Sequence, residues 1–221
     1  MSHSPSSRAR RTLVPARLVR LLLSPRLGIR FATLLGLGIV TFVLCQAIAY
    51  WWLPDGLLRG RSISAIASGD VAAQSFGAEW ARIAVFNLAI LLLFYVAANL
   101  LRLPNGVPLG YNTVIVMQAY FGVLTGTNSF TLRFEAGKIA PSPHWLAMPG
   151  FYELAAYALA ATATYEISRW QDVRVRGKTR TVRFHPTQGG WRNPQLRFGL
   201  AVAILMLVAA NGWEASRIVG L

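Results

Sequence analysis

The amino-acid sequence predicts an all-α protein, a polytopic membrane helix bundle with five transmembrane helices. Three observations support this fold class. The chain is 54% hydrophobic and only 14% charged, whereas soluble domains carry about a quarter charged residues. Long uncharged runs recur along the sequence, and the basic residues gather between these runs. We therefore expect lipid rather than water around most of the chain.

The five predicted spans are uncharged runs, or nearly so, that are long enough to cross a bilayer. A helix rises about 1.5 Å per residue, so about 20 residues cross the hydrocarbon core. The spans are predicted at residues 31–53, 83–101, 107–126, 145–167 and 198–213. The last span is the shortest, and we expect Trp191 and Trp213 to anchor its ends at the membrane interfaces. A basic segment, residues 1–30, precedes this transmembrane domain, residues 31–221.

The distribution of lysine and arginine predicts the orientation. Segment 1–30, the link between the second and third spans, and loop 168–197 together hold 16 of the 22 basic residues. With five spans these three regions share one side of the membrane, and cytoplasmic loops carry an excess of lysine and arginine. We therefore expect the N-terminus in the cytoplasm and the C-terminus outside.

Loop 168–197 alternates valine and arginine over residues 173–176, then has Gly177-Lys178, and continues with residues 179–184. This pattern predicts a small, basic cytoplasmic β-hairpin. Four of its residues are candidates for contact with lipid or a partner: Arg174, Arg176, Lys178 and Arg180. A basic loop that only fixes the topology is the alternative interpretation.

The segment 13–30 is both basic and apolar and is interrupted by Pro15 and Pro25. It predicts a short amphipathic helix along the inner leaflet. Anionic lipid headgroups are the expected partners of the arginines. Nucleic acid is not expected as a partner, because the arginines fall between apolar segments rather than on one face.

Glu153 is the most unusual residue within a predicted span. It lies about a third of the way into the fourth span, with no lysine or arginine within ten positions. A charge at the bilayer centre costs about 2.5–3.5 kcal/mol on insertion scales, so this carboxyl group is expected to face protein or water. Asn87 and Asn112 on neighbouring spans are its candidate partners, and the three form a predicted intramembrane polar cluster.

Three roles remain open for Glu153. In the first, Glu153 is protonated and hydrogen-bonded to Asn87 or Asn112, and so holds the helices together. In the second, it belongs to an ion or proton path. In the third, it faces an aqueous cavity or a re-entrant loop built from residues 141–150. Glu166, near the predicted cytoplasmic end of the same span, is expected to pair with Arg169.

Other residues with chemical potential are few. His144 is a candidate pH-sensitive group or ligand, with a plain interfacial position as the alternative. The single cysteine, Cys45, excludes an internal disulfide and a multi-cysteine metal site. The alanines at 155–163 predict close packing of the fourth span against another helix or another subunit, and Gly36 and Gly38 predict the same for the first span.

The stretch FNLAILLLFYVAANLLRLPNGVPLGYNTVIVMQAYFGVL, followed by PHWLAMPGFYELAAYALAA, resembles the stage II sporulation protein M family of integral membrane proteins. Those proteins typically show an asparagine-bearing helix, a glycine-rich turn, and a segment of small residues with a Glu-Leu pair. Asn87, residues 105–110 and residues 153–156 match by position, and the match covers about residues 80–167. In the family a His-Gly pair runs almost directly into Glu-Leu, whereas here an insertion follows His144.

The resemblance implies a multi-pass protein of the bacterial cytoplasmic (inner) membrane that acts as a scaffold or partner in larger membrane machinery. The family's namesake works with cell-wall-remodelling partners in sporulating bacteria, and other members look like companions of transporters. Other membrane protein subunits are thus the implied partners, and a homo-oligomer is compatible with the same features. Neither the residues nor the resemblance identifies a cofactor.

Two functions compete. The first is a non-enzymatic integral membrane subunit or scaffold that packs into a larger assembly, favoured by the alanine-rich span and the small extramembrane mass. The second is a transporter or channel component with a polar path around Glu153. An enzyme is not expected, because the sequence has no HExxH, Walker A or GxSxG motif. The two acids of the fourth span, Glu153 and Glu166, lie about 20 Å apart along a helix, too far to act as a pair.

Overall fold

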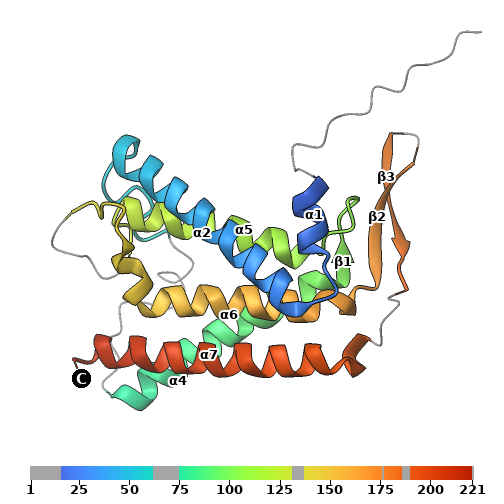
Figure 1. Ribbon diagram of the computed structural model, residues 1–221. Coiled ribbons are helices and arrows are strands. Elements are labelled where there is room, and N and C mark those ends of the chain that lie inside the picture. Colours follow the sequence, from blue (N-terminus) through green and yellow to red (C-terminus); the bar gives the residue numbers. More distant parts are fainter. Residues whose placement is uncertain (1–15, 62–74, 131–136, 176, 186–189, 221) are drawn as a thin grey trace, which may run out of the picture.

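The computed structural model describes residues 16–61, 75–130, 137–175, 177–185 and 190–220. This part of the chain is mostly helical, with a small sheet at one end of the helix bundle (Figure 1). The long helices are α2 (Leu27–Trp52), α4 (Phe76–Ile90), α5 (Leu109–Gly126), α6 (Pro149–Ala163) and α7 (Pro194–Ile218). The predicted helical class is confirmed.

Three helical stretches are long and apolar enough to cross a membrane: Leu27–Trp52, Phe76–Leu100 and Pro194–Ile218. They indicate a membrane protein. The other two long helices are shorter, with 18 residues in α5 and 15 in α6. Five spans and their orientation therefore stay predictions.

The helices do not begin and end where the predicted spans do. The sequence bounds a span at its first charged residue, but α2 includes Arg30, and α7 includes both Arg197 and Glu214. The predicted fourth span, 145–167, starts too early, because a 3₁₀ turn at Pro143–Ala147 precedes α6. Charged residues can lie inside a membrane helix when they are near its ends and reach the interface or a partner.

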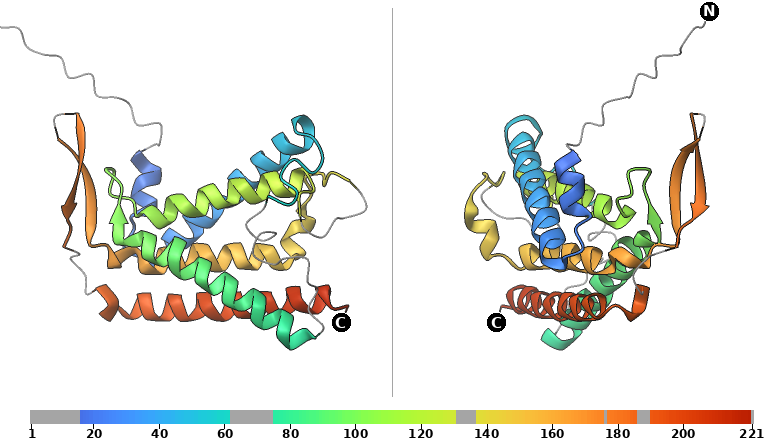
Figure 2. Two further views of the ribbon diagram at one scale, coloured as in Figure 1. Left: turned by 180° about the vertical axis from the view of Figure 1, so that it is seen from behind. Right: turned by 45° about the vertical axis from the view of Figure 1, so that its right-hand side comes forward.

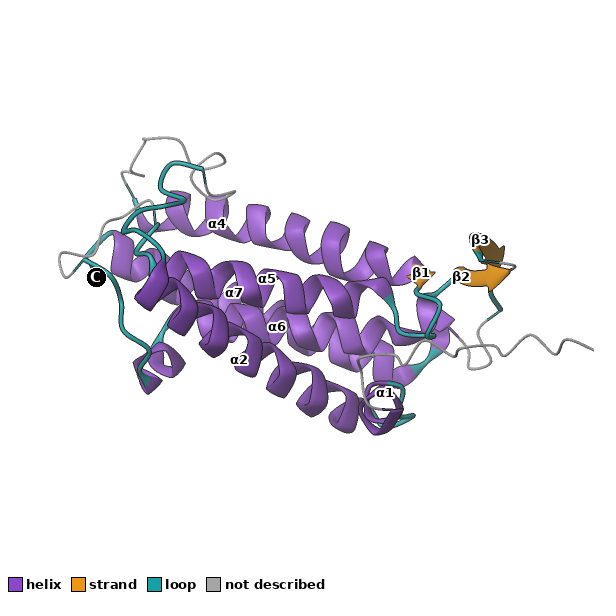
Figure 3. Cartoon of the chain, turned by 90° about the horizontal axis from the view of Figure 1, so that it is seen from above, coloured by secondary structure: helices purple, strands orange, loops and turns teal. Residues whose placement is uncertain are grey.

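The central helix of the bundle is α6. Every residue from Leu154 to Ala163 is buried, whereas α2 and α7 bury only one face, at every third or fourth residue. In Figure 1, α6 runs between α2 and α5 on one side and α7 on the other, and the view from above shows the long helices lying alongside one another (Figure 3). The alanine-rich segment is thus enclosed by protein on all sides.

Asn99 joins three helical segments near one end of the bundle. The stretch that starts with α4 continues as a π-helix, Leu91–Val96, and a 3₁₀ turn, Ala97–Leu100, which carries Asn99. Its Nδ2 donates to the carbonyl oxygen of Ala161 (2.6 Å) and to Oγ1 of Thr164 (2.8 Å). Its Oδ1 accepts from the backbone nitrogen of Gly110 (3.0 Å). One fully buried amide therefore fixes the end of this stretch against α5 and α6.

Glycines set the distance between α2 and α5. A Cβ atom on Gly122 would lie 2.5 Å from the carbonyl oxygen of Phe42, and one on Gly126 would lie 2.5 Å from that of Gln46. This spacing of two glycines four residues apart allows backbones to approach closely. Of the two glycines expected to act in this way on α2, Gly38 faces the side chain of Gln118, but Gly36 faces open space.

The sheet has three strands in the order β1-β2-β3: β1 (Leu101–Arg102), β2 (Trp170–Val175) and β3 (Lys178–Arg183). β2 and β3 form an antiparallel hairpin that pairs Val175 with Lys178, with Gly177 in the turn at a φ of 79°. The predicted hairpin is confirmed, and it stands away from the helices (Figure 2). β1, which pairs with β2 in parallel, was not expected. Arg176 lies outside the described residues.

The N-terminal segment contains the short helix α1 (Ala16–Leu22), and the chain turns at Pro25 before α2. The expected helix and its interruption at Pro25 are therefore present. The remainder of the predicted basic segment, residues 1–15, lies outside the described residues.

Gly122→Ala is expected to destabilise the protein, because the added methyl group meets the backbone of α2. Overpacking of this kind costs about 1–3 kcal/mol. Gly36→Ala is the matched control: it also lies in a helix but faces open space, so this variant should be as stable as wild type or slightly more stable. Thermal unfolding of both variants in detergent, followed by circular dichroism, checks this. Equal stability of the two variants would contradict the close contact.

Candidate functional site

Polar side chains gather where α4, α6 and α7 meet, at the end of the bundle opposite the hairpin. We call this group the carboxyl–amide cluster. Its members interact with one another across three helices. They are Glu79, Arg82 and Asn87 on α4, Glu153 on α6, and Asn211 and Glu214 on α7.

Asn87 is the centre of the cluster's hydrogen bonds. Its Nδ2 donates to Oε1 of Glu153 (3.2 Å) and to Oδ1 of Asn211 (2.8 Å). Both asparagines are buried. The structure therefore brings the predicted pair, Glu153 and Asn87, together, and adds Asn211 from the last helix.

Two carboxyl groups lie side by side in this cluster. Glu153 lies near the start of α6, and Glu214 lies near the end of α7, close enough for their charges to affect each other. Both residues are partly exposed. The neighbouring rings of Tyr152 and Trp213, 5.8 Å apart between centroids, are also exposed, as is typical of the level of a membrane interface.

The third carboxylate of the cluster has a cationic partner. Glu79 is buried, and its side chain forms an ion pair with Arg82, whose Nε donates to Oε2 of Glu79 (3.1 Å). Arg82 is exposed at its tip and also attracts Glu214. The guanidinium group therefore offsets part of the negative charge that the three acids can carry.

Asn211 has an unsatisfied donor. Its side chain is fully buried and its Oδ1 accepts from Asn87, but its Nδ2 has no hydrogen-bond acceptor. A buried donor without an acceptor costs about 1–3 kcal/mol.

The remaining predicted site residues lie elsewhere. Asn112 is exposed in the first turn of α5, near the hairpin, so it does not join Glu153, which lies in the first turns of the antiparallel α6. His144 is exposed in the 3₁₀ turn before α6. Among the described residues, no group of three His, Cys, Asp or Glu side chains could hold a metal ion.

Glu166 does not pair with Arg169 as expected. It is buried and accepts from Nδ2 of Asn193 (2.7 Å). The helical conformation ends at Ile167, so Arg169 no longer shares a helix face with Glu166 and is exposed.

A second polar group, at the hairpin end, is built from arginines that the sequence places in loops. The guanidinium groups of Arg30 and Arg102 lie 4.7 Å and 4.4 Å from the ring centroid of Tyr165. Arg30 donates to the carbonyl oxygens of Ser24 (2.6 Å) and Thr162 (3.3 Å). Guanidinium groups stack on aromatic rings and are weakly hydrated, which makes arginine suited to burial of this kind.

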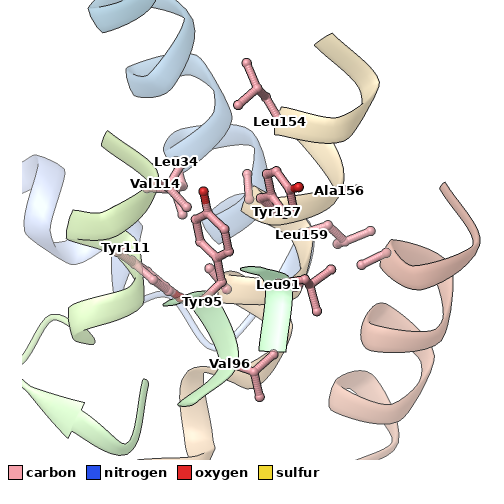
Figure 4. Packing of buried hydrophobic residues seen from close by; sticks show 14 of the residues in the cluster. Leu34, Leu91, Tyr95, Val96, Tyr111, Val114, Leu154, Ala156, Tyr157 and Leu159 are labelled. Carbon is pink, nitrogen blue, oxygen red and sulfur yellow. The ribbon is translucent and has the colours of Figure 1, made fainter. Parts of the chain in front are cut away.

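Two stacked tyrosines lie in the core beyond Glu153. Tyr157 is one helical turn further along α6, and its ring stacks on that of Tyr95 with centroids 4.6 Å apart. Figure 4 shows both rings among the buried side chains of several helices. The hydroxyl group of Tyr95 is buried without a hydrogen-bond partner.

Sequence reasoning missed Glu79, Asn211 and Glu214. Two of them lie outside the predicted spans 83–101 and 198–213, although the helices include them. The available signal was spacing: Glu79, Ile83 and Asn87 recur at every fourth residue and so share one helix face. Comparison with protein-family models, with curated proteins and with solved structures found no match to this chain.

Asn87→Ala is expected to lower the free energy of unfolding by about 1–3 kcal/mol, because it leaves Asn211 and Glu153 without their shared donor. Asn112→Ala removes the same groups from an exposed site and should change stability by about 0.5 kcal/mol or less. Unfolding of both variants in detergent, measured under identical conditions, tests the assignment. A larger loss for the Asn112 variant would contradict it.

Proposed function

We propose that this protein is a non-enzymatic integral membrane subunit or scaffold that packs into a larger membrane assembly. The observation that carries this proposal is the free edge of the sheet. β3 is the last strand in the order β1-β2-β3, and all six of its residues are exposed. An unpaired edge strand is a template for pairing with another chain, and native proteins usually shorten or cover such edges.

The charge of the hairpin supports the same proposal. Arg174, Lys178, Arg180 and Arg183 are all exposed on β2 and β3, while Asp172 accepts from Thr181 across the strands (2.7 Å). This basic surface suits an acidic partner segment or anionic lipid headgroups. The positive-inside rule supports a cytoplasmic position for the hairpin, in the bacterial cytoplasmic (inner) membrane.

The resemblance of residues 80–167 to the stage II sporulation protein M family favours this subunit function, and we propose membership of that family. No catalytic role is part of the proposal, since the sequence carries no catalytic motif. In the cluster at the opposite end, Asn87 and Arg82 bond to neighbouring protein groups, as is expected of polar residues that hold helices together.

Reversal of two hairpin charges, Lys178→Glu with Arg180→Glu, should abolish co-purification of partner polypeptides. The wild-type particle, solubilised in mild detergent, should have a mass above that of one chain and contain other proteins. Arg61→Glu, an exposed site at the other end of the bundle, is the control and should retain the partners. A wild-type particle containing only copies of this chain would overturn the subunit proposal.

Transport is the second candidate, and one observation favours it. Tyr157, one turn from Glu153, stacks on Tyr95 in the core, and the hydroxyl group of Tyr95 is buried without a hydrogen-bond partner. A buried hydroxyl group that can donate and accept is suited to passing on a proton. This candidate makes the protein a proton-conducting component of its assembly.

Glu153→Gln and Tyr95→Phe should each reduce proton flux into liposomes by roughly a hundredfold, the lower range for loss of a positioned proton-transfer group. The flux is measured with a pH-sensitive dye under a potassium-diffusion potential. Glu166→Gln, in the 3₁₀ turn that follows α6, serves as the control and should conduct like wild type. If wild-type liposomes conduct no faster than empty ones, the transport candidate is rejected.

A further inference from the structure

We propose that β3 binds an extended, acidic segment of another protein, which adds to the sheet as a fourth strand. Such a segment belongs to a neighbouring subunit, so the inference rests on the subunit function proposed above. The contact combines a row of backbone hydrogen bonds with pairing of opposite charges, whereas lipid headgroups can supply only the charge.

The outer edge of β3 presents the backbone groups of alternate residues. The backbone nitrogen of Phe184 donates to the carbonyl oxygen of Arg169 (2.7 Å), which continues the register of β2 and β3. In an antiparallel ladder, successive residues of a strand point their N–H and C=O groups to opposite sides. Since those of Phe184 point toward β2, the outward groups belong to every second residue before it: Thr179, Thr181 and Arg183.

Nothing in the described part of the chain covers this edge. β3 is the last strand of the sheet, and all six of its residues are exposed. Outside the ladder to β2, no described backbone group bonds to the backbone of Thr179, Thr181 or Arg183. The hairpin stands away from the helices (Figure 2), and its outer edge is therefore open to another chain.

Cations flank the edge on both faces of the hairpin. Side chains alternate between the two faces along a strand, so Lys178 and Arg180 share one face and Arg183 lies on the other. Asp172 accepts from Oγ1 of Thr181 (2.7 Å), and among the described residues it forms no ion pair with these cations. An added strand with acids opposite the cations therefore gains favourable cross-strand pairs.

The same charges exclude two other occupants. A second copy of β3 along the edge would bring Lys178, Arg180 and Arg183 against the same cations. Like charges directly opposite each other are destabilising, and charged residues on an edge strand prevent pairing of identical edges. Another segment of this chain does not fit, because no six consecutive residues contain two acids. The occupant is therefore a segment of a different protein.

A synthetic peptide tests strand addition directly. The core sequence Glu-Val-Thr-Glu-Thr-Glu, laid antiparallel to residues 178–183, places an acid opposite each cation and a valine opposite Val182. The full-length protein in nanodiscs of zwitterionic lipid should bind the labelled peptide, as measured by fluorescence anisotropy. A peptide with lysine in place of each glutamate is the control and should not bind.

Thr179→Pro separates backbone pairing from charge. The outward N–H of Thr179 takes no part in the ladder to β2, so proline there keeps the hairpin and every charge but removes a donor for the added strand. The affinity for the peptide should fall by about tenfold or more. Thr179→Ala retains the N–H and should bind like wild type. Equal binding by the proline variant would show that charge alone drives the contact, and the proposal would be rejected.

Hydrogen exchange gives a second measurement if the proline variant folds poorly. In the wild type, the peptide should protect the three outward amides of Thr179, Thr181 and Arg183, because they become hydrogen-bonded. Vesicles that contain phosphatidylglycerol should not protect them. Unchanged exchange with the peptide, or binding of the vesicles but not of the peptide, would overturn strand addition.

Failure of strand addition can be told apart from failure of the subunit proposal. Native partners that co-purify with the Thr179→Pro variant as they do with wild type would leave the subunit function in place and reject β3 as their site. Peptide binding by a wild-type particle that contains only copies of this chain would reject the subunit function and support the strand-binding site.

Discussion

The enclosure of α6 is the constraint on which the other contacts depend. Between helices in lipid there is little hydrophobic driving force, so association depends on close packing and on polar contacts. The segment from Ala155 to Ala163 has mostly methyl side chains, which lets α2, α5 and α7 approach it closely. At Gly199 of α7, an added Cβ would lie only 2.8 Å from the Cβ of Ala163. Larger side chains on either surface would separate the helices.

Small side chains alone do not fix the position of a helix along its neighbour, because one smooth surface can slide along another. Polar contacts at the two ends of α6 fix this position. At one end, Glu153 is tied to Asn87. At the other end, the carbonyl oxygens of Ala161 and Thr162 accept from Asn99 and Arg30. A slip of one turn would leave these buried donors without acceptors, at a cost of about 1–3 kcal/mol each.

The sequence predicted the features that depend on local pattern. The helical class, the hairpin around Gly177 and the interruption at Pro25 each follow from composition or turn chemistry over a few residues. The proximity of Glu153 and Asn87 also followed, because lone polar residues in apolar helices tend to find each other. For the spans and for Glu153, the guiding rule was that charged side chains avoid lipid.

The same rule failed at the helix ends. It excluded Glu79 and Glu214 from the spans and assigned Arg30 and Arg102 to loops, because it treats every charge as a boundary. In the structure these residues lie in helices or pack against them. Other protein groups there form an ion pair with Glu79 and accept hydrogen bonds from Arg30 and Arg102. Asn112 shows the converse error. Because it lies in an apolar run it was expected inside the bundle, but it is exposed near the end of its helix. Only the arrangement of helices in space separates these cases.

The arginine group at the hairpin end and the carboxyl–amide cluster differ in how completely their polar atoms find partners. At the hairpin end, Arg30 is buried but donates to two carbonyl oxygens and lies over the ring of Tyr165. Arg102 has one nitrogen, Nε, without an acceptor, yet its guanidinium group lies over Tyr165 and Phe184. These side chains keep a fixed charge, so their surroundings need to suit only one state. The carboxyl–amide cluster is satisfied less completely, since Nδ2 of Asn211 is buried without an acceptor.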